Sequence, residues 1–326
     1  MKRKFRFILP VLFLSMTLTG CDWITITDPT GGGGSGSGTS QKTLDKYYDG
    51  YDLNKKGERL TLELQRNCWE KHTEWVTYSQ VNSYFIKTSS HDSAEAIKSG
   101  SSTNQYFYTG KEQGGYGTRE HVWPCASSDS HWDHKENSGI YYVDYDKYIG
   151  GGSDLYHIRT CNSKINTQRG NSKFVSFSDP EMADYRDEVI EAGESGGKYK
   201  IKIQGYDSAQ EYAKRCEPAD EMKGDVARVV LYVWLHYKSR GYTPTGSKVS
   251  GKYTYVYADM MKATLNLTDV IGYDTEDKCL EVLSRWNQID PPSDVEKLRN
   301  NTVQKIQGNR NPFVDYPELL DKIINA

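Results

Sequence analysis

The alternation of apolar and polar residues along the chain predicts three long helical regions. Residues 44–85 carry apolar and aromatic positions at helical spacing, as in GERLTLELQRNCW. The stretch from Lys223 to Tyr237, KGDVARVVLYVWLHY, is apolar on most of its sides, which is typical of a buried helix. A polar helix is expected after the proline break and Asp/Ser cap of DPPSD, and it should end at the turn formed by Gly308 and Asn309.

Short strands are predicted between these helices. Residues 198–203, KYKIKI, alternate so that their three lysines would share one face. Such lysines either contact phosphates or protect a solvated edge strand, and we favour the edge strand. Residues 118–124 and 154–160 read as two further strands separated by a Gly-, Ser- and Asp-rich loop, and residues 161–170 as a short helix. The pattern therefore indicates an α+β fold in which helices outweigh strands.

The N-terminus predicts export and a lipid anchor. Residues 1–20 combine a basic start with an apolar stretch that is too short to span a bilayer, as in a signal peptide. The sequence LTGC ends at Cys21 and looks like a bacterial lipobox, in which the cysteine is lipidated after cleavage. Residues 21–43, which contain GGGGSGSGTS, form a flexible tether. One folded domain is expected over residues 44–326, in a lipoprotein on the extracytoplasmic face of a membrane.

Charge and cysteine content limit the partners and the chemistry. Without residues 1–20 the chain has 37 basic and 44 acidic residues, a net charge of −7. Such a chain gives no long-range attraction to a polyanion, so a nucleic-acid substrate would need a local basic patch or a metal ion. Five cysteines besides Cys21 permit disulfides in an extracytoplasmic setting, but none has the CxxC spacing of a zinc site.

Four polar residues of the strand at 118–124 and the helix at 161–170 suggest phosphodiester hydrolysis. Glu120 and His121 lie in the first short strand, and Asn166 and Arg169 share one face of the following helix. Hydrolysis of a phosphodiester needs a base for water, a cation for the developing charge and donors for phosphate oxygens. A histidine suits the base, because its ordinary pKa lies near ambient pH. A carboxylate and an amide oxygen suit a hard cation that keeps several waters, as Mg²⁺ does.

The same motifs resemble a known family. REHVWP, DLYHIR and NTQRGNSKF, in this order, are similar to the bacterial endonuclease I family of ββα-metal (His-Me finger) nucleases. YFYTGK before them, and KGDVARVVLYVWLHY and QGNRNPFVDYPEL after them, extend the resemblance over most of residues 44–326. It implies a ββα-metal core embedded in a mainly helical domain.

The resemblance also implies roles for individual residues. His121 matches the general base, Glu120 and Asn166 match the metal ligands, and Arg169 either contacts phosphate or braces the helix. The implied cofactor is Mg²⁺, with Mn²⁺ or Ca²⁺ as alternatives. Because neighbouring side chains of a regular strand point to opposite faces, Glu120 and His121 can serve one phosphate only if strand pairing ends or twists around residues 119–122. Pro124, which cannot donate to a ladder, favours such an end.

The remaining histidines are expected to be structural. His157 should hold the second strand, His236 ends a buried helix, and His131 and His134 lie in a loop without further ligand pattern. We therefore expect a monomeric, membrane-anchored endonuclease of low sequence specificity that cleaves DNA, with RNA also open, and leaves 5′-phosphates. Two alternatives remain at this stage, namely an inactive nucleic-acid-binding or adhesion module and a phosphoesterase for small nucleotides.

Overall fold

The computed structural model describes residues 40–82, 84, 103–114, 117–124, 140–142, 148–205, 214–238 and 265–325. The predicted signal segment, Cys21 and most of the tether therefore lie outside the described residues, as do Cys125, His131 and His134. None of the described helices is long and apolar enough to cross a membrane.

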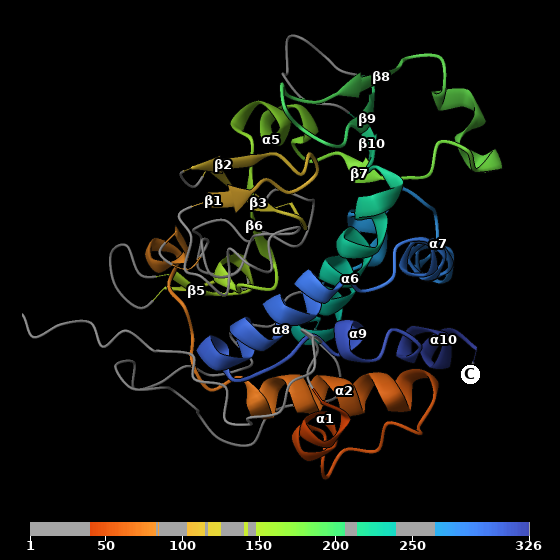
Figure 1. Ribbon diagram of the computed structural model, residues 1–326. Helices are drawn as coiled ribbons and strands as arrows, with labels where there is room; N and C mark the ends of the chain where they lie inside the picture. Colours follow the sequence, from red (N-terminus) through yellow and green to blue (C-terminus); the bar gives the residue numbers. More distant parts are fainter. Residues whose placement is uncertain are drawn as a thin grey trace, which may run out of the picture. The chain divides into compact units, whose positions relative to one another are not determined.

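Helices and small sheets make up the described fold, which confirms the predicted α+β class (Figure 1). The described α-helices are α1 (Gln41–Tyr47), α2 (Gly57–Lys71), α5 (Ser163–Arg169), α6 (Asp220–Tyr237), α7 (Glu276–Ile289), α8 (Asp294–Gln307), α9 (Pro312–Asp315) and α10 (Leu319–Ile324). The described strands are β1 (Thr103–Gln105), β2 (Glu112–Gly114), β3 (Thr118–His121), β4 (Ile140–Tyr142), β5 (Tyr148–Gly150), β6 (Ile158–Cys161), β7 (Lys173–Phe174), β8 (Val189–Ala192), β9 (Ile201–Gln204) and β10 (Arg215–Glu217).

Helix α6 forms the centre of the hydrophobic core. It packs against α2, α7 and α9, and its apolar residues from Val226 to Leu235 are buried. This agrees with the buried helix expected from its sequence, because a helix that is apolar on most sides needs neighbours on most sides. The predicted polar helix is α8, which Ser293 caps through the N–H of Glu296 and which ends at Gly308 with φ of 92°.

Two expectations about strands were wrong. Strand β9 is not an edge strand, because the four-stranded sheet has the order β7-β10-β9-β8. Only Lys202 of the three lysines lies within β9, where it is exposed and 3.7 Å from Glu217. Lys198 and Lys200 come before the strand, and Lys200 pairs with Glu191 at 2.9 Å. The second predicted strand is also shorter than expected, since the carbonyl of Asp154 accepts the N–H groups of residues 157 and 158 in a turn and β6 begins only afterwards.

Candidate active site

Strands β3 and β6 form an antiparallel pair that carries the predicted site. Glu120 lies opposite Arg159, and His121 lies opposite Ile158 in the last pair of the ladder. Gly117, directly before β3, lets the backbone pass close to β6. It has φ of 58°, and a Cβ there would lie 2.4 Å from the carbonyl oxygen of Cys161. Pairing thus ends at His121, as the sequence predicts, and helix α5 follows directly on β6.

Glu120 points into the protein and uses one carboxylate oxygen for internal hydrogen bonds. Its Oε1 accepts the hydroxyl of Tyr108 at 2.7 Å and Nη1 of Arg169 at 3.2 Å. Oε2 accepts no hydrogen bond from the described residues, and it is not completely buried. Oε2 is therefore the oxygen of this carboxylate that is available to a cation.

Burial sets the charge balance of Glu120. Loss of solvent raises the pKa of its carboxyl, while the charge of Arg169 and the hydrogen bond from Tyr108 act in the opposite direction. The net shift is upward, so the carboxylate is less stable as an anion than in water. A divalent cation on Oε2 would supply the positive charge that favours the ionised form.

Tyr108 was not identified as a site residue from the sequence, although it lies in the YFYTGK block. Its ring is fully buried, and its backbone has φ of 70°, a left-handed conformation that is uncommon outside glycine. The following turn is closed by a hydrogen bond from the N–H of Gly110 to the carbonyl of Tyr106 at 2.8 Å. The strained turn thus directs the Tyr108 hydroxyl to Glu120, a contact that no local sequence signal reveals.

Arg169 is buried and binds the end of strand β3. It is 1% exposed, and its Nη1 donates to the carbonyl of His121 at 3.1 Å as well as to Glu120. Its Nη2 donates to the carbonyl of Val122 at 2.7 Å, and its guanidinium lies over the ring of Phe174. These contacts favour the bracing role that the sequence left open for Arg169 over direct contact with phosphate.

Asn166 is held so that its side-chain oxygen can act as a ligand. Asn162 caps the N-terminus of helix α5, and its side chain accepts the N–H groups of residues 164 and 165. In the middle of this helix, Nδ2 of Asn166 donates to Oγ1 of Thr118 at 3.0 Å and to the carbonyl of Arg119 at 3.1 Å. Because both amide hydrogens are used against β3, Oδ1 is the remaining polar atom and can only accept or coordinate.

His121 lies on the opposite face of β3 from Glu120 and is half-buried. Its Nε2 is 2.9 Å from the carbonyl oxygen of Gly152, so this nitrogen carries the proton in the neutral ring and Nδ1 is the acceptor. The ring lies nearly parallel to that of Tyr78, with 5.8 Å between centroids, and meets His157 edge-on at 5.4 Å. These contacts fix the orientation of the imidazole.

His157 supports the site from inside the protein, in agreement with its predicted structural role. Its Nδ1 donates to the carbonyl of Gly151 at 2.7 Å, and its Nε2 accepts the N–H of Trp123 at 3.0 Å. Burial, together with a smaller effect of the nearby His121, lowers the pKa of His157 to about 3. His157 therefore stays neutral and adds no charge beside His121.

The oxygens of Glu120 and Asn166 fit a divalent cation. A hard cation such as Mg²⁺ prefers carboxylate and amide oxygens and keeps several waters when the protein supplies one or two ligands. Both side chains are held in place. Arg169 donates to Glu120 and to the His121 carbonyl, and Asn166 donates to the Arg119 carbonyl. By donor chemistry alone, these two oxygens therefore suit a divalent cation.

A second group of potential ligands, His72, Asp154 and His236, was not predicted from the sequence. One ligand atom from each lies within 4.8 Å of the others, and all three residues are buried. Both oxygens of Asp154 already accept hydrogen bonds, from two tyrosine hydroxyls, one side-chain amide and one backbone N–H. Because these donors occupy the carboxylate, the group is a hydrogen-bonded core network, in which burial lowers the pKa of His72 to about 4.

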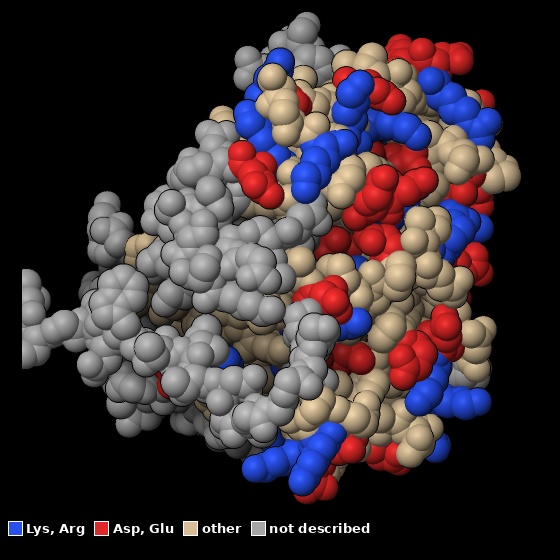
Figure 2. All heavy atoms as spheres, in the orientation of Figure 1, with Lys and Arg blue, Asp and Glu red and all other residues tan. Residues whose placement is uncertain are grey.

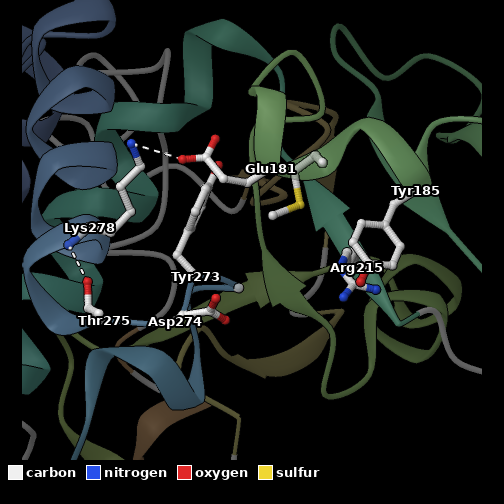
Figure 3. A pocket seen from close by; sticks show the side chains of 9 residues that line it. Glu181, Tyr185, Arg215, Tyr273, Asp274, Thr275 and Lys278 are labelled. Carbon is white, nitrogen blue, oxygen red and sulfur yellow. Dashed lines mark hydrogen bonds and ion pairs between the residues drawn. The ribbon is translucent and has the colours of Figure 1, made fainter.

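A cavity of about 300 Å³ lies elsewhere, between η3 (Pro180–Tyr185) and the start of α7. In Figure 3 its wall shows Lys278 paired with Glu181, and Arg215 against the ring of Tyr185. None of the predicted site residues lines it. On the face drawn in Figure 2, acidic and basic side chains are interspersed over the described surface, as the nearly balanced composition leads one to expect.

Comparison with known proteins supports these motifs. The family model described as Endonuclease I matches residues 58–318. An extracellular ribonuclease of Bacillus subtilis is 28% identical over 286 residues, which cover 86% of this chain and 78% of the relative. An extracellular ribonuclease of Bacillus amyloliquefaciens is 30% identical over 210 residues, which cover 63% of this chain and 53% of the relative.

Proposed function

Because this chain belongs to the endonuclease I family, and is therefore a nuclease that hydrolyses phosphodiester bonds, we propose that it uses His121 as general base and one divalent cation held by Glu120 and Asn166. One hydrogen-bond pattern supports this most directly. Glu120 Oε1 and Asn166 Nδ2 are engaged with the protein, whereas Glu120 Oε2 and Asn166 Oδ1 are directed to no described donor. Two oxygens are thus left that a cation could bind.

His121 takes the proton from the attacking water. Because its Nε2–H donates to the Gly152 carbonyl, Nδ1 is the unprotonated nitrogen that takes up this proton. The same carbonyl stabilises the imidazolium. The contacts with Tyr78 and His157 keep the ring oriented before and after the transfer. Arg169 acts as a positioning residue, because it holds Glu120 and the His121 carbonyl with a single nitrogen.

When bound, the cation supplies positive charge for the phosphate oxygens and the departing oxygen. Mg²⁺ is the expected ion, and Mn²⁺ or Ca²⁺ would meet the same oxygen ligands. Glu120 supplies the charge that holds it, and the hydrogen bonds of Asn166 to Thr118 and Arg119 keep Oδ1 in place.

DNA and RNA are both proposed as substrates. Attack by water makes no use of a ribose 2′-hydroxyl, so the same residues can act on either backbone and leave 5′-phosphate ends. The relatives that are named extracellular ribonucleases support the RNA activity. Sequence specificity is expected to be low, since binding would rely on backbone phosphates rather than on base edges.

The chain is further proposed to act outside the cytoplasm, anchored by a lipid on Cys21. The lipobox-like LTGC and the Gly/Ser-rich residues after it support this location, and so do relatives described as extracellular. Metabolic labelling with a radioactive fatty acid should mark the protein. The label should be lost in Cys21→Ser, and a labelled Cys21→Ser protein would refute the anchor.

The nuclease proposal is tested with supercoiled plasmid and a long RNA, each incubated with Mg²⁺ or with a chelator. We expect internal cleavage of both with Mg²⁺, none with chelator, and 5′-phosphates on the products. RNA products that end in 2′,3′-cyclic phosphate would show attack by the 2′-hydroxyl instead of water. Full activity in chelator would exclude the cation.

A further inference from the structure

Arg119 lies on the same face of strand β3 as His121. Residues two apart in a strand point to the same side, and the buried Glu120 between them points to the other. Both Arg119 and His121 are half-buried, so each presents part of its side chain to solvent. The strand thus places one guanidinium beside the proposed general base, about 7 Å along the chain.

The guanidinium of Arg119 is held in a defined plane. Its Nε donates to Oδ1 of Asn82 at 2.9 Å, and its central carbon lies 4.2 Å from the centroid of the Tyr78 ring. The same tyrosine ring lies parallel to the imidazole of His121. Tyr78 therefore aligns the arginine and the histidine with each other.

The outer nitrogens of Arg119 have a different use from those of Arg169. Nη1 and Nη2 of Arg169 donate to Glu120 and to two backbone carbonyls inside the protein. For Arg119, no acceptor of Nη1 or Nη2 is found among the described residues, and no carboxylate pairs with it there. The two adjacent Nη groups of a guanidinium match the geometry of a phosphate group.

We propose that Arg119 binds a backbone phosphate of the substrate next to the one that is cleaved. This role rests on the proposed function of His121 and extends the site by one nucleotide. A chain with more acidic than basic residues gains little from long-range attraction, so a local, oriented guanidinium beside the base is an effective way to hold the strand. Because it reads only the backbone, it adds affinity without sequence preference.

The test compares Arg119→Gln and Arg119→Met with Arg215→Gln. Methionine keeps an unbranched stem over Tyr78 but removes the charge, so it covers the case in which glutamine disturbs the fold. Arg215 is a matched control, because it also lies over a tyrosine, 3.4 Å from the ring centroid of Tyr185, but in another sheet. Binding of a fluorescent single-stranded oligonucleotide is measured in chelator at 50 to 200 mM salt, and cleavage is measured separately with Mg²⁺.

Loss of one phosphate contact should flatten the salt dependence of binding. Over this fourfold range of salt, the wild-type dissociation constant should rise about threefold more than that of either Arg119 variant. Arg215→Gln should keep the wild-type slope. An unchanged slope in both Arg119 variants, in a protein that still cleaves nucleic acid, would overturn the role of Arg119 alone. A wild-type protein without cleavage would instead refute the proposed function.

Discussion

Replacing Tyr108 by phenylalanine removes a single oxygen from the candidate site. The ring is fully buried, and its hydroxyl donates to Oε1 of Glu120 at 2.7 Å. Phenylalanine fills the same space, so the substitution tests the hydrogen bond with little change in packing. Arg169 still donates to the same oxygen in the variant.

The expected magnitude follows from the energy of a hydrogen bond to a charged group. Such a bond contributes about 1.5–3 kcal/mol. Because this hydrogen bond favours the ionised carboxylate, losing it should raise the pKa of Glu120, and about 1.4 kcal/mol of lost stabilisation corresponds to a tenfold weaker cation affinity. Burial already raises this pKa, and the loss of Tyr108 acts in the same direction. Protons then compete more strongly with the cation for the carboxylate.

The assay is a titration of cleavage rate with Mg²⁺ at pH 6 and at pH 8.5. At pH 6 the Tyr108→Phe variant should need roughly ten times more Mg²⁺ than the wild type for half-maximal rate. The difference should shrink at pH 8.5, because protons compete less with the cation for the carboxylate at higher pH. The Tyr48→Phe variant is the control, since Tyr48 is also buried and donates to a carboxylate, Asp315, at 2.7 Å.

Two results would refute this reasoning. One is a Mg²⁺ requirement that is the same in Tyr108→Phe and Tyr48→Phe. The other is an increase of equal size at both pH values, since that would show a loss of geometry rather than a shift in the pKa of Glu120.

Three further predictions concern the same region. Asn166→Ala should raise the Mg²⁺ concentration needed for half-maximal rate at least about tenfold, and Asn166→Asp, which keeps an oxygen, should raise it less. Mg²⁺ titrations of Asn166→Ala that match those of the wild type would count against Asn166 as a ligand. Arg169→Met should lower the free energy of unfolding, measured in urea, by about 3–5 kcal/mol, because the buried Glu120 loses its ion pair with the guanidinium. A loss below about 1 kcal/mol would contradict that pairing. His157 and His72 have folded-state pKa values lowered to about 3 and about 4, so the unfolded chain takes up their protons first as the pH falls below about 6.5. Stability should therefore be full above pH 6.5 and lower by about 4 kcal/mol at pH 5, as measured by urea unfolding, and equal stability at both pH values would disprove their neutral burial.

Hydrophobic pattern and capping residues predicted the elements that depend on nearby sequence alone. Helix α6 is apolar on most sides and helix α8 has both a serine cap and a glycine end, so pattern and capping suffice to find them. The end of pairing at His121 was likewise foreseeable from a proline three residues later. The proposal of His121 as base and of Glu120 and Asn166 as ligands came from the resemblance to a family, because a Glu-His pair alone does not distinguish a site from a surface strand.

Contacts between distant residues were not predictable from the pattern. Alternation predicted a strand at residues 198–203, but not that β8 and β10 lie on either side of β9. The hydrogen bond from Tyr108 to Glu120 depends on a backbone conformation with positive φ at a residue that gives no sign of it. His72 and His236 meet at 3.1 Å although they are 164 positions apart in the chain.

The most direct test of the proposed mechanism is cleavage by His121→Gly with and without added imidazole. Loss of a general base should lower the single-turnover rate with Mg²⁺ by about 100- to 10,000-fold, while the urea unfolding curve stays close to that of the wild type. Free imidazole should then restore part of the rate in His121→Gly and leave the wild type unaffected. A variant that cleaves within a few-fold of the wild-type rate would show that another group activates the water.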